Sequence, residues 1–119
     1  MAWSFSSDKP VYLQIAERIT ASVLCGDYKP GEQIPTVRQL ALEAAVNPNT
    51  VQHAFCELEN NGLVISQGTI GRYVTKDTAV IENCRKQLTE NIVRSFIKKC
   101  ENLSIDKAQI INMIEEVCK

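Results

Sequence analysis

The sequence contains no apolar run that approaches the roughly 20 residues needed to span a bilayer. Its first ten residues, MAWSFSSDKP, also lack the basic start and the apolar stretch of a secretory signal peptide. Internal repeats, low-complexity tracts and long linkers are missing too. We therefore expect a cytoplasmic protein with no membrane partner, and 119 residues suit one small domain with a short appendage.

An excess of charge of either sign is also missing. The net charge is −1 at pH 7, and residues 1–76 hold six basic and seven acidic side chains. A partner held only by bulk electrostatic attraction is thereby excluded. If the protein binds nucleic acid, a few well-placed cations and helix termini must supply the attraction.

The five cysteines have no C-x-x-C spacing, which argues against a disulfide framework and a zinc site. In a reducing cytosol they are most simply small apolar residues, and a redox or metal-sensing role is the alternative. The only histidine, His53, has no nucleophile motif around it, and the phosphate-binding pattern G-x-x-x-x-G-K-[ST] is absent. We expect a protein that is not an enzyme and has no catalytic residue, cofactor or metal site.

Helical periodicity, in contrast, is plentiful. A first helix is predicted over residues 10–25, with Pro10 suited to its first turn and Gly26 to the position after its end. A turn-rich segment follows, and Thr36 with Gln39 then forms a capping box that opens a short second helix. The apolar faces of the two helices consist of Tyr12, Ile15, Ala16, Ile19 and Val23, and of Val37, Leu40, Ala41 and Ala44.

A third helix follows after the short connection AVN, a spacing typical of a helix-turn-helix. Asn47 is a favoured N-cap, Pro48 suits the first helical position, and Gly62 ends the helix. Its apolar face consists of Val51, Ala54, Phe55 and Leu58. The β-prone runs LVIS and RYVT, joined by QGTIG, then predict a hairpin. Three helices followed by a hairpin is the order of a winged helix.

From Asp77 the sequence predicts two helices separated by ENLS, with Ser104 as the N-cap of the second. These 43 residues cannot bury two apolar faces against each other alone, so we expect homodimerisation. The expected dimer contacts are Leu88, Ile92, Phe96, Ile110 and Ile114. The predicted fold is mainly α with a small β-hairpin: a winged helix-turn-helix domain over residues 1–76 and an α-helical dimerisation tail over residues 77–119.

The motifs P-G-E, I-P-T-V-R-Q-L-A, V-N-P-N-T-V, E-L-E-x-x-G and G-x-Y-V occur in that order between residues 30 and 74. This order resembles the DNA-binding domain of the GntR family of bacterial transcription regulators, and the short tail looks like that of the YtrA-type subfamily. The resemblance implies a repressor that binds a palindromic operator as a homodimer. Members of this subfamily often regulate transporter operons.

The resemblance also implies that Arg38 contacts DNA and that residues 47–53 begin the recognition helix. The first turn of a helix offers free backbone amides and a partial positive charge, and Asn and Gln side chains can pair with adenine. We expect base readout by Asn49, Gln52 and His53, and phosphate contacts by Arg38 and Thr50. Asn47 serves as a cap with or without DNA, and Thr69 and Arg72 are the candidates in the wing.

Simpler structural roles remain open for several of these side chains. Arg38 could pair with Glu43 or Glu57, Thr50 could cap locally, and Gln52 could be merely solvated.

Two positions depart from the subfamily. His53 stands where arginine is common, which lowers the attraction for DNA and allows affinity to vary with pH. Ile70 stands in the wing where a basic residue is frequent, and Arg72 and Lys76 are the candidates to compensate. Docking of the wing is therefore less strongly predicted than docking of the recognition helix.

Two alternative functions follow from the composition. The near-neutral charge is compatible with a winged helix used as a protein-interaction module, and the cysteines with a redox-responsive regulator. A small-molecule effector is a further partner to consider. Because a two-helix tail has little room for a pocket of about 300 Å³, we expect any effector site at a dimer or domain junction.

Overall fold

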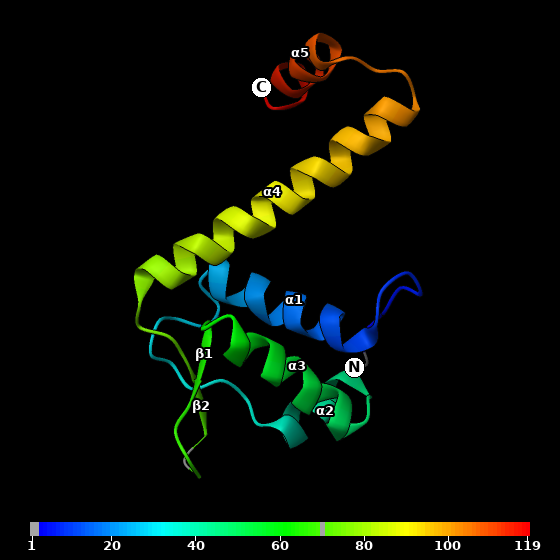
Figure 1. Cartoon of the computed structure of the whole chain (residues 1–119). Coiled ribbons are helices and arrows are strands. Elements are labelled where there is room, and N and C mark those ends of the chain that lie inside the picture. The colour runs from blue at the N-terminus through cyan, green and yellow to red at the C-terminus, as the bar shows by residue number, and fades with distance from the viewer. Residues whose placement is uncertain (1–2, 70) are drawn as a thin grey trace. The chain divides into compact units, whose positions relative to one another are not determined.

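The computed structural model describes residues 3–69 and 71–119. The elements follow in the order α1 (Val11–Leu24), α2 (Val37–Ala44), α3 (Pro48–Asn60), β1 (Val64–Ser66), β2 (Arg72–Val74), α4 (Thr78–Asn102) and α5 (Lys107–Val117) (Figure 1). The predicted class, mainly helical with one antiparallel hairpin, is confirmed. The chain forms two compact units, residues 1–85 and 86–119. Ile70 lies outside the described residues.

Side-chain caps set the starts of α2 and α3. The Thr36 hydroxyl accepts a hydrogen bond from the Gln39 amide at 3.1 Å, and the Gln39 side chain accepts one from the Thr36 amide at 2.8 Å. The Asn47 side chain accepts from the Asn49 amide at 2.8 Å, with Pro48 in the first helical turn. Both predicted caps are confirmed, and they fix where α2 and α3 begin.

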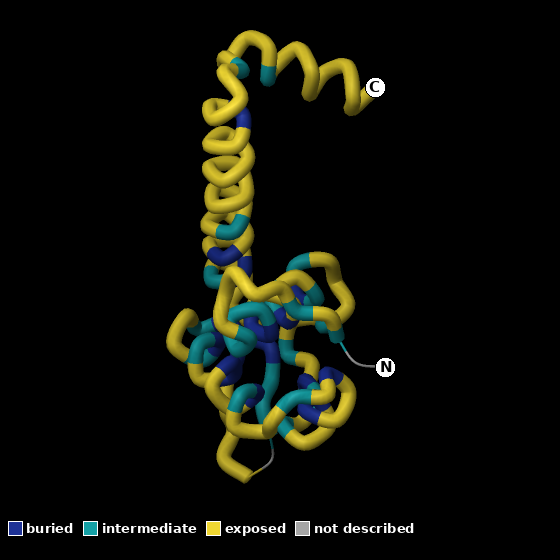
Figure 2. Tube along the Cα trace, turned by 90° about the vertical axis from the view of Figure 1, so that its right-hand side faces the viewer, coloured by how far each residue is buried: buried dark blue, intermediate teal, exposed yellow. Residues whose placement is uncertain are grey.

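The core of the first unit lies between α1, α2, α3 and the hairpin. Helix α3 packs against both α1 and α2, and the predicted apolar stripes of these helices are mostly buried. The largest fully buried side chains are Phe55, Ile15, Leu40, Leu58, Leu63, Val51, Val64 and Val74. Ile81 and Cys84 from the first turns of α4 join the same cluster. Figure 2 shows that burial is concentrated in this unit.

The wing is more extensive than the predicted hairpin. Strands β1 and β2 pair antiparallel, with Ile65 opposite Tyr73. The segment before α2, which we predicted as turns alone, pairs with β2 through a bridge between Gln33 and Tyr73. The Ile34 amide donates to the Arg72 carbonyl at 3.0 Å, so β2 is bonded on both sides and the wing is tied to the helix-turn-helix.

The prediction that Ser104 caps α5 is wrong. Ser104 has φ 60 and terminates α4: its amide donates to the Glu101 carbonyl, and the Ile105 amide donates to the Cys100 carbonyl. These two bonds form a Schellman turn with serine in the left-handed position usually taken by glycine. The N-cap of α5 is Asp106, whose carboxylate accepts from the Gln109 amide at 2.9 Å.

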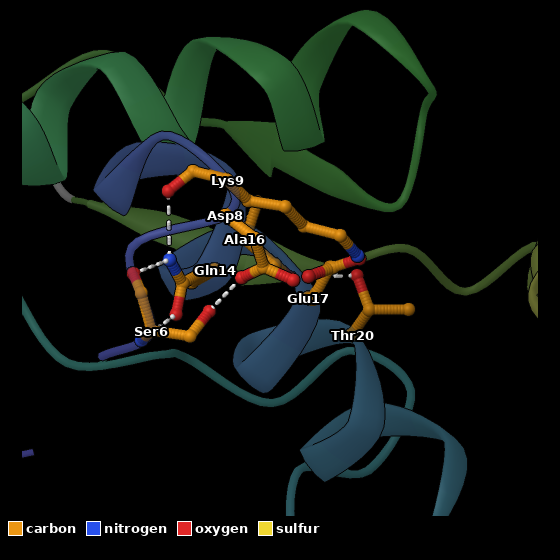
Figure 3. A network of polar contacts seen from close by, with 7 residues as sticks. All are labelled: Ser6, Asp8, Lys9, Gln14, Ala16, Glu17 and Thr20. Atoms are coloured by element: carbon orange, nitrogen blue, oxygen red, sulfur yellow. Dashed lines mark hydrogen bonds and ion pairs between the residues drawn. The ribbon is translucent and has the colours of Figure 1, made fainter. Parts of the chain in front are cut away.

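Residues 3–9, for which the sequence predicts no element, fold back along α1. The Gln14 side chain donates to the carbonyl oxygens of Ser6 and Lys9 at 2.9 and 2.8 Å, and the Lys9 ammonium pairs with Glu17 at 2.9 Å. Figure 3 shows this network, including the bond from the Ser6 hydroxyl to the Asp8 carboxylate. The network anchors the chain at the start of α1, close to the position of Tyr12.

Candidate nucleic-acid interface

The outer face of α3 carries the polar residues predicted to read bases. Asn49, Gln52 and His53 are exposed and Thr50 is half-buried. The opposite face, formed by Val51, Ala54, Phe55 and Leu58, is fully buried in the core. Because one face is fixed by burial, the polar face of the first two turns is held outward as a set.

The expectation of free backbone amides in the first turn of α3 is wrong. Pro48 has no amide hydrogen, and the Asn49 amide is bound by the Asn47 side chain. The Thr50 and Val51 amides both donate to the Asn47 carbonyl, at 3.0 and 3.4 Å. The helix dipole and the side chains remain available to DNA, but these amides are already used by the cap.

Arg38 projects from α2 with its side chain exposed. Among the described residues, no ion pair joins Arg38 to Glu43 or Glu57. The guanidinium group is therefore not neutralised by the carboxylates that the sequence offered as its alternative partners. An exposed guanidinium with five donors suits a phosphate contact.

An aromatic stack joins α3 to α1. The rings of Tyr12 and His53 lie face to face, with centroids 3.5 Å apart and planes at 7°. Asn49, Thr50 and His53 share an open depression of about 390 Å³ with Val11 and Tyr12. The sequence places Tyr12 in the buried stripe of α1, and its contribution to this surface was not predicted. The sequence does offer one indication: Tyr12 lies at the end of the apolar stripe, where the polar tip of a tyrosine commonly reaches solvent.

The two wing candidates have different surroundings. Thr69 is exposed near the tip of the hairpin. Arg72 is held against α3: its Nε lies 2.6 Å from a Glu59 carboxylate oxygen, and its guanidinium carbon lies 4.7 Å from the Phe55 ring centroid. The exposed fractions of these paired side chains are 23% for Arg72 and 32% for Glu59. Among the described residues, the only hydrogen bond of the Arg72 side chain is the one that Nε donates to Glu59.

The tight turn before β2 depends on glycine. Gly71 has φ 136, and a Cβ placed on it would lie 2.6 Å from the Gln33 side-chain nitrogen. A larger residue would strain the backbone at this φ and would require the Gln33 side chain to move.

The cysteines fall into two groups. Cys84 and Cys100 are buried, and Cys25, Cys56 and Cys118 are exposed with free thiols. Burial raises the pKa of the Cys84 thiol above its ordinary value of 9.0, which keeps it protonated and poorly reactive near neutral pH. Within residues 3–69 and 71–119, no three His, Cys, Asp or Glu side chains gather in a way that could hold a metal ion.

The second unit exposes several large apolar side chains. Among the predicted dimer residues, Leu88 and Ile110 are half-buried, whereas Ile92, Phe96 and Ile114 are 61%, 44% and 47% exposed. An open groove of about 430 Å³ between α4 and α5 is lined mainly by aliphatic and aromatic side chains. The expectation that a single tail lacks room for a pocket is therefore wrong, because α5 turns back after Ser104 and leaves a concave apolar wall.

No helix among the described residues is both long enough and apolar enough to cross a membrane. A winged helix with an outward-facing polar turn on its third helix is the architecture of a DNA-binding protein.

Comparison with known proteins gives the family. Residues 11–74 match the bacterial regulatory proteins of the gntR family. The chain is 31% identical to the uncharacterized HTH-type transcriptional regulator YhcF of Bacillus subtilis (strain 168), over 93% of this chain and 92% of that protein. It is 34% identical to the HTH-type transcriptional repressor YtrA of the same organism, over 84% of this chain and 72% of that protein.

Solved structures agree. A GntR family transcriptional regulator from Listeria monocytogenes superposes with a TM-score of 0.86 at 32% identity, covering 94% of this chain and 98% of that one. The DNA-binding domain of AraR in complex with operator ORX1 superposes with a TM-score of 0.56 at 28% identity, covering 63% of this chain and 92% of that one.

The chain belongs to the GntR family, and its relatives include the YtrA-type regulators expected from the short tail. It is a DNA-binding transcription regulator and not an enzyme.

Proposed function

We propose that the protein is a homodimeric repressor that binds a two-fold symmetric operator through the amino-terminal turns of two α3 helices. The observation that carries this proposal is the outward-held set Asn49, Gln52 and His53 above a fully buried apolar face. The operator complex of the AraR domain supports it, because that domain shares the fold at 28% identity. The name of the relative YtrA supports repression.

Within this proposal the interface divides into two kinds of contact. Gln52, Asn49 and His53 contact base edges in the major groove, because amide and imidazole groups can both donate and accept. Arg38 and Thr50 contact phosphates, which position the protein without selecting sequence. From the wing, Thr69 and the Nη groups of Arg72 add contacts to the backbone, and Asn47 both caps α3 and borders the site.

Dimerisation would occur through the apolar surface of residues 77–119, with residues 1–76 as the DNA-binding domain. In the single chain, Ile92, Phe96 and Ile114 are exposed to solvent. Burying them against a second copy of the chain would remove a large apolar surface from water. A pair of recognition helices can then enter successive major grooves, about 34 Å apart, on one face of the duplex.

Substitutions of Arg38 and Gln52 test the division of labour. Arg38→Ala should weaken binding to every sequence and reduce the dependence of log affinity on log salt by about one unit. Gln52→Ala should instead cost about 1–3 kcal/mol of discrimination at one base pair of each half-site. Equal losses on operator and random DNA for both variants would contradict the assignment.

A salt titration separates this function from a protein-interaction module. DNA binding through phosphate contacts must weaken steeply as salt rises, because each contact releases condensed counterions. A titration of wild-type protein against duplex DNA at about 50 and 200 mM salt should show that decline. Absence of DNA binding at the lower salt concentration would favour the interaction module.

The redox alternative has one specific observation in its favour, because Cys56 is an exposed thiol on the recognition helix itself. Mild oxidation should then abolish operator binding reversibly in wild type and leave Cys56→Ser unaffected. Operator affinity that is indifferent to oxidant would remove this alternative.

A further inference from the structure

We propose that Tyr12 is a specificity-determining positioning residue of the DNA interface: its ring fixes the orientation in which the His53 imidazole meets one base pair of each half-site. The proposal rests on the proposed function of α3 as the recognition helix. The helix-turn-helix motif consists of α2 and α3. The proposal therefore gives a role in base selection to α1, a helix that does not belong to the motif.

The stack covers a face of the imidazole and leaves its edge free. With ring centroids 3.5 Å apart and planes at 7°, the Tyr12 ring lies directly against the His53 ring. Both imidazole nitrogens lie in the ring plane, so a partner stacked on the face does not block them. No residue in the described part of the chain hydrogen-bonds to either nitrogen, and the His53 side chain is exposed. The edge that carries hydrogen-bonding capacity is therefore available to a base.

Tyr12 is itself held in place before DNA arrives. It is half-buried and packs against the core cluster of the first unit. Gln14, two residues further along α1, ties this end of the helix to Ser6 and Lys9. An exposed side chain on a helix surface samples several rotamers, and ordering it on binding weakens affinity. Stacking on an anchored ring lowers that cost for the imidazole.

The surroundings of the stack also suit a base edge. Val11 and Tyr12 provide an apolar wall, and Asn49, Thr50 and His53 provide polar groups, around a depression that is open to solvent. An apolar wall beside hydrogen-bonding groups is the combination that recognises a thymine methyl next to a base edge. We therefore expect the base pair contacted by His53 to have its thymine methyl against Val11.

The experiment compares the base preferences of wild type, Tyr12→Phe, Tyr12→Leu, His53→Ala and the double variant Tyr12→Leu with His53→Ala. Affinities are measured on the selected operator and on all its single-base-pair substitutions, and on random DNA. Tyr12→Phe retains the ring and Tyr12→Leu fills the space without one, so they are matched for burial. Thermal unfolding followed by circular dichroism confirms that each variant folds.

We expect His53→Ala to remove about tenfold discrimination at one position of each half-site. Tyr12→Leu should lose at least threefold at that same position, Tyr12→Phe should match wild type, and the double variant should match His53→Ala. In the free protein, Tyr12→Leu should shift the His53 ring-proton NMR signals and Tyr12→Phe should not, because the neighbouring ring current is lost only in the former.

A uniform loss of affinity on all sequences in Tyr12→Leu would overturn the proposal, as would additive effects in the double variant. These results leave wild-type operator binding intact, so they differ from failure of the proposed function, in which wild type itself shows no salt-dependent preference for any sequence. That second result would overturn both.

Discussion

Individual side chains determine which parts of the interface are fixed before DNA arrives. Arg72 is bound through Nε to Glu59 and lies over Phe55, so it links the wing to α3. Arg38 has no such partner among Glu43 and Glu57 in the described residues. The two arginines therefore differ in their surroundings: Arg72 is held against α3, whereas the Arg38 guanidinium is not paired with either of these carboxylates.

The Arg72–Glu59 pair should contribute to stability. Glu59→Gln and Arg72→Gln should each lower the free energy of unfolding by roughly 1 kcal/mol, because each leaves a partly buried charge without its partner. Urea denaturation of both single variants and of the double variant measures the coupling between the two side chains. The loss of unfolding free energy in the double variant should be smaller than the sum of the two single losses. Glu57→Gln, on the same helix but without a comparable ion pair, is the control. Additive losses would mean that the two side chains act independently.

Tyr28 should make the fold sensitive to alkaline pH. Burial first, and then the nearby carboxylates of Glu43, Glu32 and Asp27, raise the pKa of its hydroxyl above the ordinary value of 10.0. The folded state thus holds this proton more tightly than the unfolded state does. Its contribution to stability is complete below pH 10 and is lost as pH rises through the folded pKa.

Thermal unfolding of Tyr28→Phe between about pH 8 and 11 tests this linkage. The Tm of the variant should fall less over this interval than that of wild type. Comparison of the two proteins at pH 7, where the tyrosine is neutral in both states, isolates any change in packing. Parallel decreases in Tm at high pH would contradict the assignment of the alkaline loss to Tyr28.

Helix ends, at the scale of elements, determine where the polar residues of the interface are placed. The turn between α2 and α3 has only three residues: it begins at Ala45, the C-cap of α2 with φ 59 in the left-handed region, and ends at Asn47, the N-cap of α3. This turn fixes the angle between α2 and α3. A one-residue slip at Asn47 would rotate Asn49, Gln52 and His53 by about 100° relative to the core, from the 3.6-residue period of the helix.

Substitutions of Asn47 separate its role as a cap from its role next to DNA. Asn47→Ala should lower the free energy of unfolding by about 1 kcal/mol, and Asn47→Ser and Asn47→Asp should restore most of it. Only Asn47→Asp should bind DNA more weakly than wild type at equal stability, because it places a carboxylate beside the phosphates. Urea denaturation and operator titration measure the two effects. Equal DNA affinity for the Ser and Asp variants would show that residue 47 is remote from DNA.

Local signals allowed the helices to be predicted, and long-range contacts account for what was missed. Thr36 with Gln39, and Asn47 with Pro48, mark helix starts within the residues themselves. The bridge between Gln33 and Tyr73 and the stack of Tyr12 on His53 join positions far apart in sequence, and no local pattern encodes them. At the second tail helix the sequence predicted Ser104 as the cap, but Ser104 lies in the Schellman turn that ends α4, and Asp106 caps α5.

The whole molecule consists of a winged helix-turn-helix and a tail that exposes much apolar surface. In residues 86–119, large hydrophobic side chains such as Ile92, Phe96 and Val117 are at least 44% exposed. The net charge of −1 gives the protein little general attraction for DNA. Two winged helices linked in a dimer would compensate for this weak attraction. Once one winged helix has bound its half-site, binding of the second half-site becomes intramolecular. The proposed dimer would in this sense be part of the recognition mechanism.

Disruption of the tail should therefore reduce operator affinity without changing any residue that is proposed to contact DNA. Phe96→Glu, which places a charge in the apolar groove, should convert the dimer to a monomer in sedimentation velocity and weaken operator binding by at least tenfold. The helical circular dichroism should persist. Leu42→Glu is the matched control for sedimentation, because Leu42 is 78% exposed but lies on α2. A Phe96→Glu protein that remains dimeric would place the dimer contact elsewhere.

The most direct test of paired recognition by α3 is selection of bound sequences from a random pool of duplex DNA. Paired recognition predicts that the enriched sequences are two-fold symmetric, with half-sites about one helical turn apart. Substitution of Gln52 should change the enriched base at one symmetric pair of positions. Enrichment of a single unpaired half-site, or of no sequence at all, would contradict the account.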